Sequence, residues 1–152
     1  ACDSEDHLYM SDHRNNRIQK FTRDGQYISD FGSEGSGDGE FDLPWGLTVA
    51  PSGDIYVADW LNNRVQVFNP DGRFVAAMRG DATLSKLGTD KLLSNPDMIR
   101  QRALAFANNP GFEQNFQHPC AVKIDTQGRI CVLDHLRGRV QVYSKSKDPV
   151  LV

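Results

Sequence analysis

The chain has 152 residues, of which 39% are hydrophobic and 24% are charged, and its formal net charge is −3. This composition is typical of a globular protein and excludes collagen-like, low-complexity and strongly charged disordered chains. No segment approaches the roughly 18 consecutive apolar residues of a membrane-spanning helix. The 17 Lys and Arg are outnumbered by 20 Asp and Glu, which argues against a protein that follows nucleic-acid phosphates.

A two-strand pattern recurs three times along the chain, and each copy contains an Asp that is followed five residues later by an Arg. The Asp residues are Asp12, Asp59 and Asp134, separated by 47 and 75 residues. The first copy matches the second at Tyr9, Asp12, Asn15, Asn16, Arg17, Gln19, Phe21, Asp24 and Gly25. Such an internal repeat indicates architecture more firmly than chemistry.

Each copy is predicted to form a β-hairpin. The runs Ile55–Val57 and Val65–Phe68 are rich in β-branched and aromatic residues and are separated by Asn and Asp, which is typical of two strands and a turn. Asn16, Asn63 and Gly138 share one turn position. All three residue types tolerate a left-handed backbone, so we expect a positive φ there.

The repeated Asp and Arg could form a catalytic pair or could hold the fold together. The Asp can accept hydrogen bonds from the backbone amides of its turn, and the Arg can reach a neighbouring carboxylate or carbonyl. An active site is seldom built into every repeat, so we interpret these residues as structural. The residues interpreted in this way are Asp12, Asn16, Arg17, Asp59, Asn63, Arg64, Asp134, Gly138 and Arg139.

Further strands flank the hairpins. Strands are predicted after the first and second hairpins at 27–31 and 74–78, and before the second and third hairpins at 44–50 and 119–125. Four antiparallel strands in a unit of about 40 to 47 residues form one blade of a β-propeller. The predicted fold class is therefore all-β, with four-stranded antiparallel blades.

The run GSEGSGDGEFDLPWG at 32–46, followed by DIYVADWLNNRVQVFNPDG at 54–72, resembles the NHL-repeat family. Members of that family form six-bladed propellers, so the resemblance implies a propeller that has six blades when complete. The third copy departs from the pattern, because it lacks the Asn pair before Arg139 and the Asp-Gly turn after Tyr143. Three strands are therefore expected in that copy.

The predicted units are blade one at 1–32, blade two at 43–80, a helical insertion at 81–112 and blade three at 116–152. About two and a half blades cannot close a ring, which needs at least ~4 blades. In the repeat register Cys2 takes the place of Val49, so the chain is expected to open near the end of an innermost strand. We expect the remaining blades to come from sequence outside this chain or from self-association.

The connection at 32–40 is rich in Gly and carries Glu34, Asp38 and Glu40. It lacks the Lys-Ser or Lys-Thr of a phosphate-binding loop, and its carboxylates would repel phosphate. Calcium binding by these three side chains is one hypothesis, since carboxylate oxygens are hard ligands. A simple blade-to-blade connection is the alternative.

The connection that leads into the third copy is much longer and is predicted to contain two helices. Asn95-Pro96-Asp97 is a helix start, and the run at 108–111 ends the helix. A shorter helix is predicted around Leu84 to Leu93. We expect this pair to cover a seam between blades, or to act as a lid or partner-docking element on the propeller face that carries the crossovers.

The three cysteines, Cys2, Cys120 and Cys131, show no C-x-x-C spacing and occupy predicted strand positions. We interpret them as buried hydrophobic residues. An odd number of cysteines without an evident pair favours a reducing compartment such as the cytoplasm.

Three histidines share a register within the repeat. His13 and His135 directly follow the repeated Asp, and His118 precedes Pro119, so all three are expected on the face that carries the turns and crossovers. Some NHL-like propellers are metal-dependent lyases that act on peptidyl hydroxyglycine through histidine-bound zinc, so the resemblance allows a metal site here. Others bind single-stranded RNA, a further alternative to which Arg14 and Arg137 would contribute.

The function favoured by the sequence is a non-catalytic binding or protein-interaction module, without a cofactor, that recognises a protein or a small polar ligand on this face. Trp60 is the candidate anchor, because the other copies carry histidine at its position and the repeat does not require an aromatic core residue there. The alternative is that Trp60 packs beneath the inserted helices, against Leu104 or Phe106. The predicted face comprises His13, Arg14, Trp60, Leu61, His118, His135 and Arg137.

Overall fold

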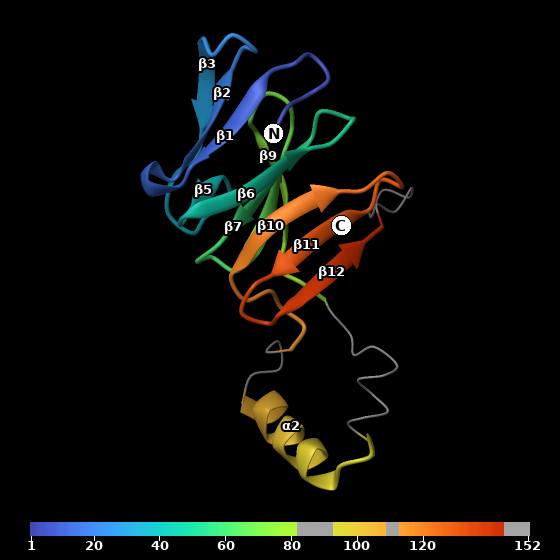
Figure 1. Cartoon of the computed structure of the whole chain (residues 1–152). Coiled ribbons are helices and arrows are strands. Elements are labelled where there is room, and N and C mark those ends of the chain that lie inside the picture. The colour runs from blue at the N-terminus through green and yellow to red at the C-terminus, as the bar shows by residue number, and fades with distance from the viewer. Residues whose placement is uncertain (82–92, 109–112, 145–152) are drawn as a thin grey trace.

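The computed structural model describes residues 1–81, 93–108 and 113–144. Three antiparallel sheets follow one another along the chain (Figure 1). Their strands are β1 (Leu8–Asp12), β2 (Arg17–Phe21) and β3 (Tyr27–Phe31) in sheet one; β6 (Pro44–Val49), β7 (Ile55–Asp59), β8 (Arg64–Phe68) and β9 (Phe74–Met78) in sheet two; and β10 (Pro119–Ile124), β11 (Ile130–Asp134) and β12 (Arg139–Tyr143) in sheet three. Within the described residues, no helix is long and apolar enough to cross a membrane.

The all-β class with antiparallel sheets is confirmed, and the predicted strands lie where expected to within two residues. Sheet two has four strands in the order β6-β7-β8-β9, while sheets one and three each have three among the described residues. A short parallel pair, β4 (Ser33–Glu34) with β5 (Glu40–Phe41), lies in the connection between sheets one and two. Cys2 forms an isolated antiparallel bridge with Leu8, as expected from the repeat register.

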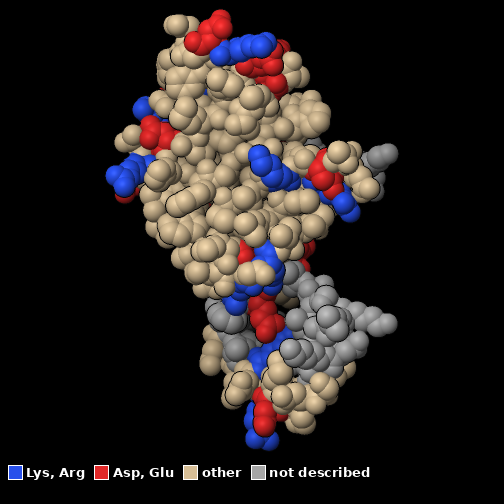
Figure 2. Space-filling view, in the orientation of Figure 1, with Lys and Arg blue, Asp and Glu red and all other residues tan. Residues whose placement is uncertain are grey.

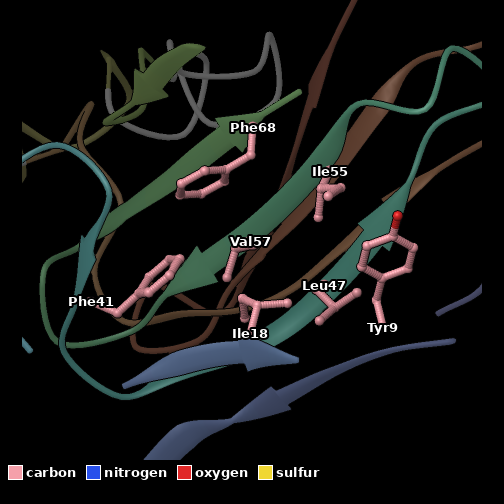
Figure 3. Packing of buried hydrophobic residues seen from close by; sticks show 7 residues of the cluster. All are labelled: Tyr9, Ile18, Phe41, Leu47, Ile55, Val57 and Phe68. Carbon is pink, nitrogen blue, oxygen red and sulfur yellow. The ribbon is translucent and has the colours of Figure 1, made fainter. Parts of the chain in front are cut away.

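Two apolar cores lie between neighbouring sheets. The first contains side chains of sheets one and two and of the connection between them, including Ile18, Phe41 and Val57 (Figure 3). The second joins sheet two to sheet three. Strands β7 and β8 are buried along their whole length because both faces of sheet two are covered. Two-sided covering explains why β7 reads as a nearly continuous apolar run. In β8, Arg64 and Gln66 are also buried, and both donate to the carbonyl of Glu40 in the connection.

Gly46 permits the inner strands of sheets two and three to approach each other closely. A Cβ atom at this position would lie 2.6 Å from the carbonyl oxygen of Cys120 and 2.8 Å from the Cα of Ala121, both in β10. Contacts this short with backbone atoms cannot be relieved by a side-chain rotation. Glycine is therefore required where β6 meets β10.

In sheets two and three, the repeated Asp and Arg hold the hairpin to the connection that precedes it. Asp59 accepts hydrogen bonds from the Arg64 Nε at 2.8 Å and from the backbone N–H of Asp42 at 2.8 Å. Arg64 also donates to the carbonyls of Ser36, Gly37 and Glu40, each within 2.9 Å. The turn contributes the side-chain amide of Asn62, which donates to Asp59 at 3.0 Å. The predicted backbone amide of the turn is replaced by one from the connection.

The same arrangement recurs in sheet three. Asp134 accepts from the Gln117 N–H at 2.6 Å and from the Arg139 Nε at 2.8 Å, and Arg139 donates to the carbonyls of residues 113–115. In both sheets the Asp and Arg side chains form hydrogen bonds with backbone N–H and carbonyl groups of the preceding connection, which has few apolar side chains of its own. These contacts explain the recurrence of the Asp and Arg as structural residues.

The shared turn position joins each sheet to the next one. Asn16, Asn63 and Gly138 have φ values of 52°, 54° and 58°, which confirms the expected left-handed backbone. The side-chain oxygen of Asn16 accepts from the Leu43 N–H at 2.8 Å, and that of Asn63 accepts from the His118 N–H at 2.8 Å. We call these two contacts the intersheet bonds. Gly138 has no side chain with which to form a third.

The insertion contains α2 (Pro96–Asn108), in agreement with the predicted start and end. The Asn95 side chain accepts from the Asp97 N–H at 3.1 Å and thereby caps the helix. Figure 1 shows α2 standing apart from the three sheets, so the expectation that it covers a seam between blades is wrong for this helix. The shorter helix predicted around 84–93 lies, apart from its last residue, outside the described residues.

The cysteines differ from their predicted burial. Cys2 is exposed, and Cys120 and Cys131 are half-buried; none of them forms a disulfide. Cys131 lies on the side of sheet three that faces away from sheet two, while its repeat counterpart Tyr56 is covered by sheet three. The prediction of buried hydrophobic cysteines is therefore wrong, and for Cys131 the reason is that no sheet among the described residues covers its side.

Candidate functional site: an aromatic row on the loop face

Hairpin turns and crossovers meet along one edge of the sheets, which we call the loop face. Pro44 at the start of β6 pairs with Asp59 at the end of β7, and Pro119 pairs with Asp134 in the same way. Residues that follow β7 therefore lie beside residues that begin β6. This geometry places Trp60, the first residue of a turn, next to Trp45, the second residue of a strand.

Four aromatic side chains form a continuous row on the loop face. The His13 and Trp45 rings have centroids 5.7 Å apart, Trp45 and Trp60 are 5.2 Å apart, and Trp60 and His118 are 5.0 Å apart. Trp60 packs edge-to-face on both of its neighbours, with interplanar angles of 62° and 60°. These distances and angles are those of favourable aromatic pairs. We call these four residues the aromatic row.

The aromatic row crosses all three sheets. His13 belongs to the 3-10 turn η1 (His13–Asn15) after β1, both tryptophans belong to sheet two, and His118 immediately precedes β10. Trp45 is 52% exposed and His13 is exposed, while Trp60 and His118 are half-buried. The row therefore offers a large apolar and polarisable surface to solvent although its members already support one another. Trp is the residue type most enriched among binding hot spots.

The backbone of His118 is fixed by the repeat. Its φ is 55°, an uncommon value for a residue with a side chain, and its N–H is held by Asn63. Leu43, at the equivalent position before β6, has φ 54° and is held by Asn16. Because both positions have a positive φ, this backbone conformation is a feature of the repeated fold and is not special to His118. Its consequence for the site is that the His118 imidazole lies against Trp60.

The structure brings together three of the predicted face residues, His13, Trp60 and His118, and connects them through Trp45. The backbone N–H of His135 donates to the carbonyl of His118 at 3.3 Å, but its exposed imidazole makes no ring contact with the row. The other predicted residues also lie in loop-face turns: Arg14 and Leu61 are exposed and Arg137 is half-buried.

The alternative packing of Trp60 under the insertion does not match its surroundings. Its ring neighbours are Trp45 and His118, and Leu104 of α2 is exposed. The side chain of Phe106 lies outside the described residues. Helix α2 is attached near sheet three by an ion pair between Arg102 and Glu113, with 2.6 Å between Nε and Oε2.

Metal ligands are not gathered on this face in the described part of the chain. Among those residues, no group of three or more His, Cys, Asp and Glu is placed to hold a metal ion, and this applies to the histidines and to Glu34, Asp38 and Glu40. Glu40 instead accepts from the Gly37 N–H at 2.8 Å, within its own connection.

The charged residues around the loop face are largely used in structural pairs. Hydrogen bonds from Asn15 and Arg17 lower the pKa of Asp12. Hydrogen bonding to Asp12 and Asp30 raises the pKa of the Arg17 guanidinium, although desolvation opposes it. Figure 2 shows a view in which most of the sheet surface is uncharged and blue and red atoms lie next to one another at its margins. No continuous basic surface is seen in this view.

Trp45 is the site residue that the sequence analysis missed. The sequence pattern places it only in a strand, and the third copy has Cys120 at its position. One signal was available: Trp45 follows Pro44 at the start of a strand, and in an antiparallel blade that start lies beside the end of the next strand, where Trp60 follows. Two tryptophans at paired strand ends predict a contact.

Successive sheets packed face to face, with hairpin turns and crossovers at one edge, define a β-propeller module. Residues 41–68 match the family model described as NHL repeat, which confirms the resemblance seen in the sequence. No curated protein matches the chain.

The chain is similar to several solved structures. These are a streptogramin B lyase (12% identity, TM-score 0.54, covering 94% of this chain and 38% of the other), virginiamycin B lyase from Staphylococcus aureus (13%, 0.53, 97% and 40%) and a protein of unknown function from Bacteroides thetaiotaomicron (19%, 0.62, 91% and 32%). The chain therefore spans at most about two fifths of their length. Identities this low establish a shared fold and do not transfer lyase activity.

Proposed function

We propose that this chain is part of an NHL-type β-propeller, six-bladed when complete, that acts as a non-catalytic binding module. In this proposal blades one, two and three span 1–32, 43–80 and 116–152, and the segment at 81–112 is an insertion. The loop face recognises a protein or a small polar ligand, and Trp60 is the central anchor. His13, Arg14, Leu61, His118, His135 and Arg137 complete the face.

The aromatic row carries the proposal. Trp45 and Trp60 contact each other, and imidazoles extend the row on both sides. A rigid pair of tryptophans supplies contact area at a low cost in side-chain entropy, because neither ring needs to be ordered on binding. The imidazoles can donate or accept hydrogen bonds at the ends of the row. Such a surface suits a partner with an apolar or aromatic group flanked by polar groups.

The test uses a displayed library of random peptides, selected on the chain and counterselected on the Trp60→Ala variant. Trp45 and Trp60 are the two tryptophans of the chain, so indole fluorescence reports directly on the site. We expect selected peptides to change this fluorescence and to lose at least ~2 kcal/mol of binding free energy with Trp60→Ala. The control is Tyr27→Ala, which removes an exposed aromatic ring of β3.

Three outcomes would contradict the anchor role. The first is a failure to recover any peptide that depends on Trp60, and the second is equal loss of binding with Tyr27→Ala. The third is a loss of folding stability of ~3 kcal/mol or more with Trp60→Ala, since that loss is typical of a core residue. A near-stoichiometric zinc content that falls with His135→Ala would instead support the metal-dependent lyase alternative. Single-stranded RNA binding with a steep salt dependence would support the second alternative.

A further inference from the structure

Asp42 lies beside the two tryptophans of the aromatic row. Its carbonyl accepts from the N–H of Leu61 at 3.1 Å, which places it against the turn that begins with Trp60. Along the chain, Trp45 follows three residues later. Asp42 is half-buried, and its carboxylate forms no hydrogen bond or ion pair with any residue that the structure describes. An unpaired negative charge therefore accompanies the row.

The repeat does not require a carboxylate at this position. The equivalent residue, 75 positions later, is Gln117, whose backbone N–H donates to Asp134 as that of Asp42 donates to Asp59. The structural role thus belongs to the N–H, which every residue type except proline supplies. In sheet two, moreover, Arg64 is already paired with Asp59. Neither the repeat nor an ion pair explains the charge of Asp42.

The rings of Trp45 and Trp60 are arranged as a corner. Their planes are inclined by 62° and their centroids are 5.2 Å apart, so a group held between them can contact the faces of both. We call these two residues the tryptophan corner. The face of an aromatic ring attracts cations because of its quadrupole, and tryptophan does so most strongly. A tryptophan corner with a neighbouring carboxylate favours a positively charged ligand.

The charges of the loop face indicate where such a ligand would lie. Arg14 follows His13 in η1 and is exposed, so it opposes a cation at the His13 end of the row. Asp42 contacts the turn of Trp60, in the middle of the row. A cation is therefore favoured between the two tryptophans and not at the His13 end.

An alkylated ammonium ion suits this corner better than a bare one. A primary ammonium is compact and strongly hydrated, and it loses that hydration at a high cost against apolar rings. Methyl groups on the nitrogen spread the charge over an apolar surface that can contact aromatic faces directly, which is how proteins recognise quaternary ammonium ligands.

We propose that the loop face binds an alkylated ammonium group, with its methyl groups in the tryptophan corner and its charge neutralised by Asp42. The group can belong to a small quaternary ammonium compound or to a methylated lysine of a protein. This inference rests on the proposed function, because it names the ligand class of the same face.

The experiment titrates the purified chain with choline and with neohexyl alcohol, the uncharged analogue in which carbon replaces nitrogen, at constant ionic strength. Indole fluorescence follows binding, since both tryptophans of the chain form the corner. We expect choline to bind at least ~10-fold more tightly than the alcohol. Equal binding, or tighter binding of the alcohol, would overturn the proposal, because an apolar surface alone prefers the uncharged compound.

A second comparison distinguishes the two sources of the group. A short peptide that contains trimethyllysine is titrated beside choline and beside the same peptide with unmodified lysine. Tighter binding of the trimethyllysine peptide than of choline supports the proposal with a protein partner, and the opposite order supports it with a small ligand. Tighter binding of the unmodified peptide than of the trimethyllysine peptide would overturn the choice of an alkylated group.

Asp42→Asn tests the carboxylate, because it removes the charge and keeps the backbone N–H. We expect it to raise the dissociation constant of choline at least ~3-fold and to leave that of neohexyl alcohol unchanged. Asp38→Asn is the matched control: it removes one charge from the same connection, where Asp38 is exposed and its neighbour Gly39 is bound to Gln66 of β8. Equal weakening by both variants would contradict the role of Asp42.

Trp45→Leu tests the ring, because it keeps an apolar side chain and leaves Trp60 as the fluorescent reporter. We expect the preference for choline over the alcohol to fall below ~3-fold. Circular dichroism shows that each variant is folded. Peptides that depend on Trp60 but carry no cationic group, together with no binding of choline, would overturn cation recognition and leave the proposed function standing. The absence of any ligand that depends on Trp60 would contradict both.

Discussion

Replacing Arg64 by Met tests whether the repeated Arg is a structural residue that holds a connection. Arg64 is 1% exposed and donates to Asp59 and to three carbonyls of the connection between sheets one and two. Methionine fills much of the same volume but donates no hydrogen bond. The variant therefore leaves a fully buried carboxylate and three carbonyls without their cationic partner.

The expected loss is large because the carboxylate stays buried. Removing one member of a buried ion pair typically costs about 3–5 kcal/mol. With an m-value of about 2 kcal/mol per M, this loss lowers the urea midpoint by roughly 2 M. Arg17→Met is the matched control: Arg17 occupies the same repeat position, but its side chain is 37% exposed and its partners Asp12 and Asp30 are also accessible to water. We expect a much smaller loss there, since exposed pairs contribute little.

The assay is equilibrium unfolding in urea, followed by circular dichroism, on both variants and the unmodified chain at low protein concentration. The reasoning requires a midpoint shift for Arg64→Met that greatly exceeds the shift for Arg17→Met, with similar m-values. Equal shifts would refute it, because they would show that the cradle of carbonyls around Arg64 adds no stability. A loss below about 1 kcal/mol for Arg64→Met would refute it as well.

Two further predictions concern the intersheet bonds and the N-terminal residues. Asn63→Gly keeps a residue that favours positive φ but removes the acceptor for His118, so we expect a loss of about 1 kcal/mol by urea unfolding, and a smaller loss for Asn63→Asp. Burial alone would raise the pKa of Asp3, but hydrogen bonds from the backbone and imidazole of His7 and from the Glu5 N–H lower it to about 2. Because the folded pKa lies below the ordinary value of 3.8, Asp3 stabilises the fold above that pH and loses this effect as the pH falls towards 2. Melting temperatures should therefore fall less steeply for Asp3→Asn between about pH 4 and pH 2, and an unchanged slope would contradict the assignment.

Much of the fold could be predicted because its signals are local and repeated. The hairpin strands, the left-handed turn position at Asn16, Asn63 and Gly138, and the helix that begins after Asn95 all follow from short-range preferences that the sequence displays directly. The hairpin strands and the left-handed turn position recur at the same place in each copy, so chance does not explain them.

The contacts that could not be predicted are those made with backbone groups distant in sequence. The acceptors of Arg64 are carbonyls 24 to 28 residues away, and every residue type has a carbonyl, so no residue pattern indicates them. The aromatic row depends on how neighbouring sheets are placed, and therefore on packing between repeats. The histidine register predicts a shared face for His13 and His118, but it could not show that tryptophans lie between the two imidazoles.

The intersheet bonds have a direction that bears on biosynthesis. In each one the acceptor side chain comes first along the chain, and the N–H that it binds is made 27 or 55 residues later. At a synthesis rate of about 5–20 residues per second, Asn16 waits roughly 1–5 s for Leu43 and Asn63 roughly 3–11 s for His118. The insertion also doubles the length of the second loop, which raises the entropy cost of closing it by about 0.6 kcal/mol. A nascent chain can therefore dock each later sheet onto one that is already made, and we expect the addition of sheet three to be the slower of the two docking steps.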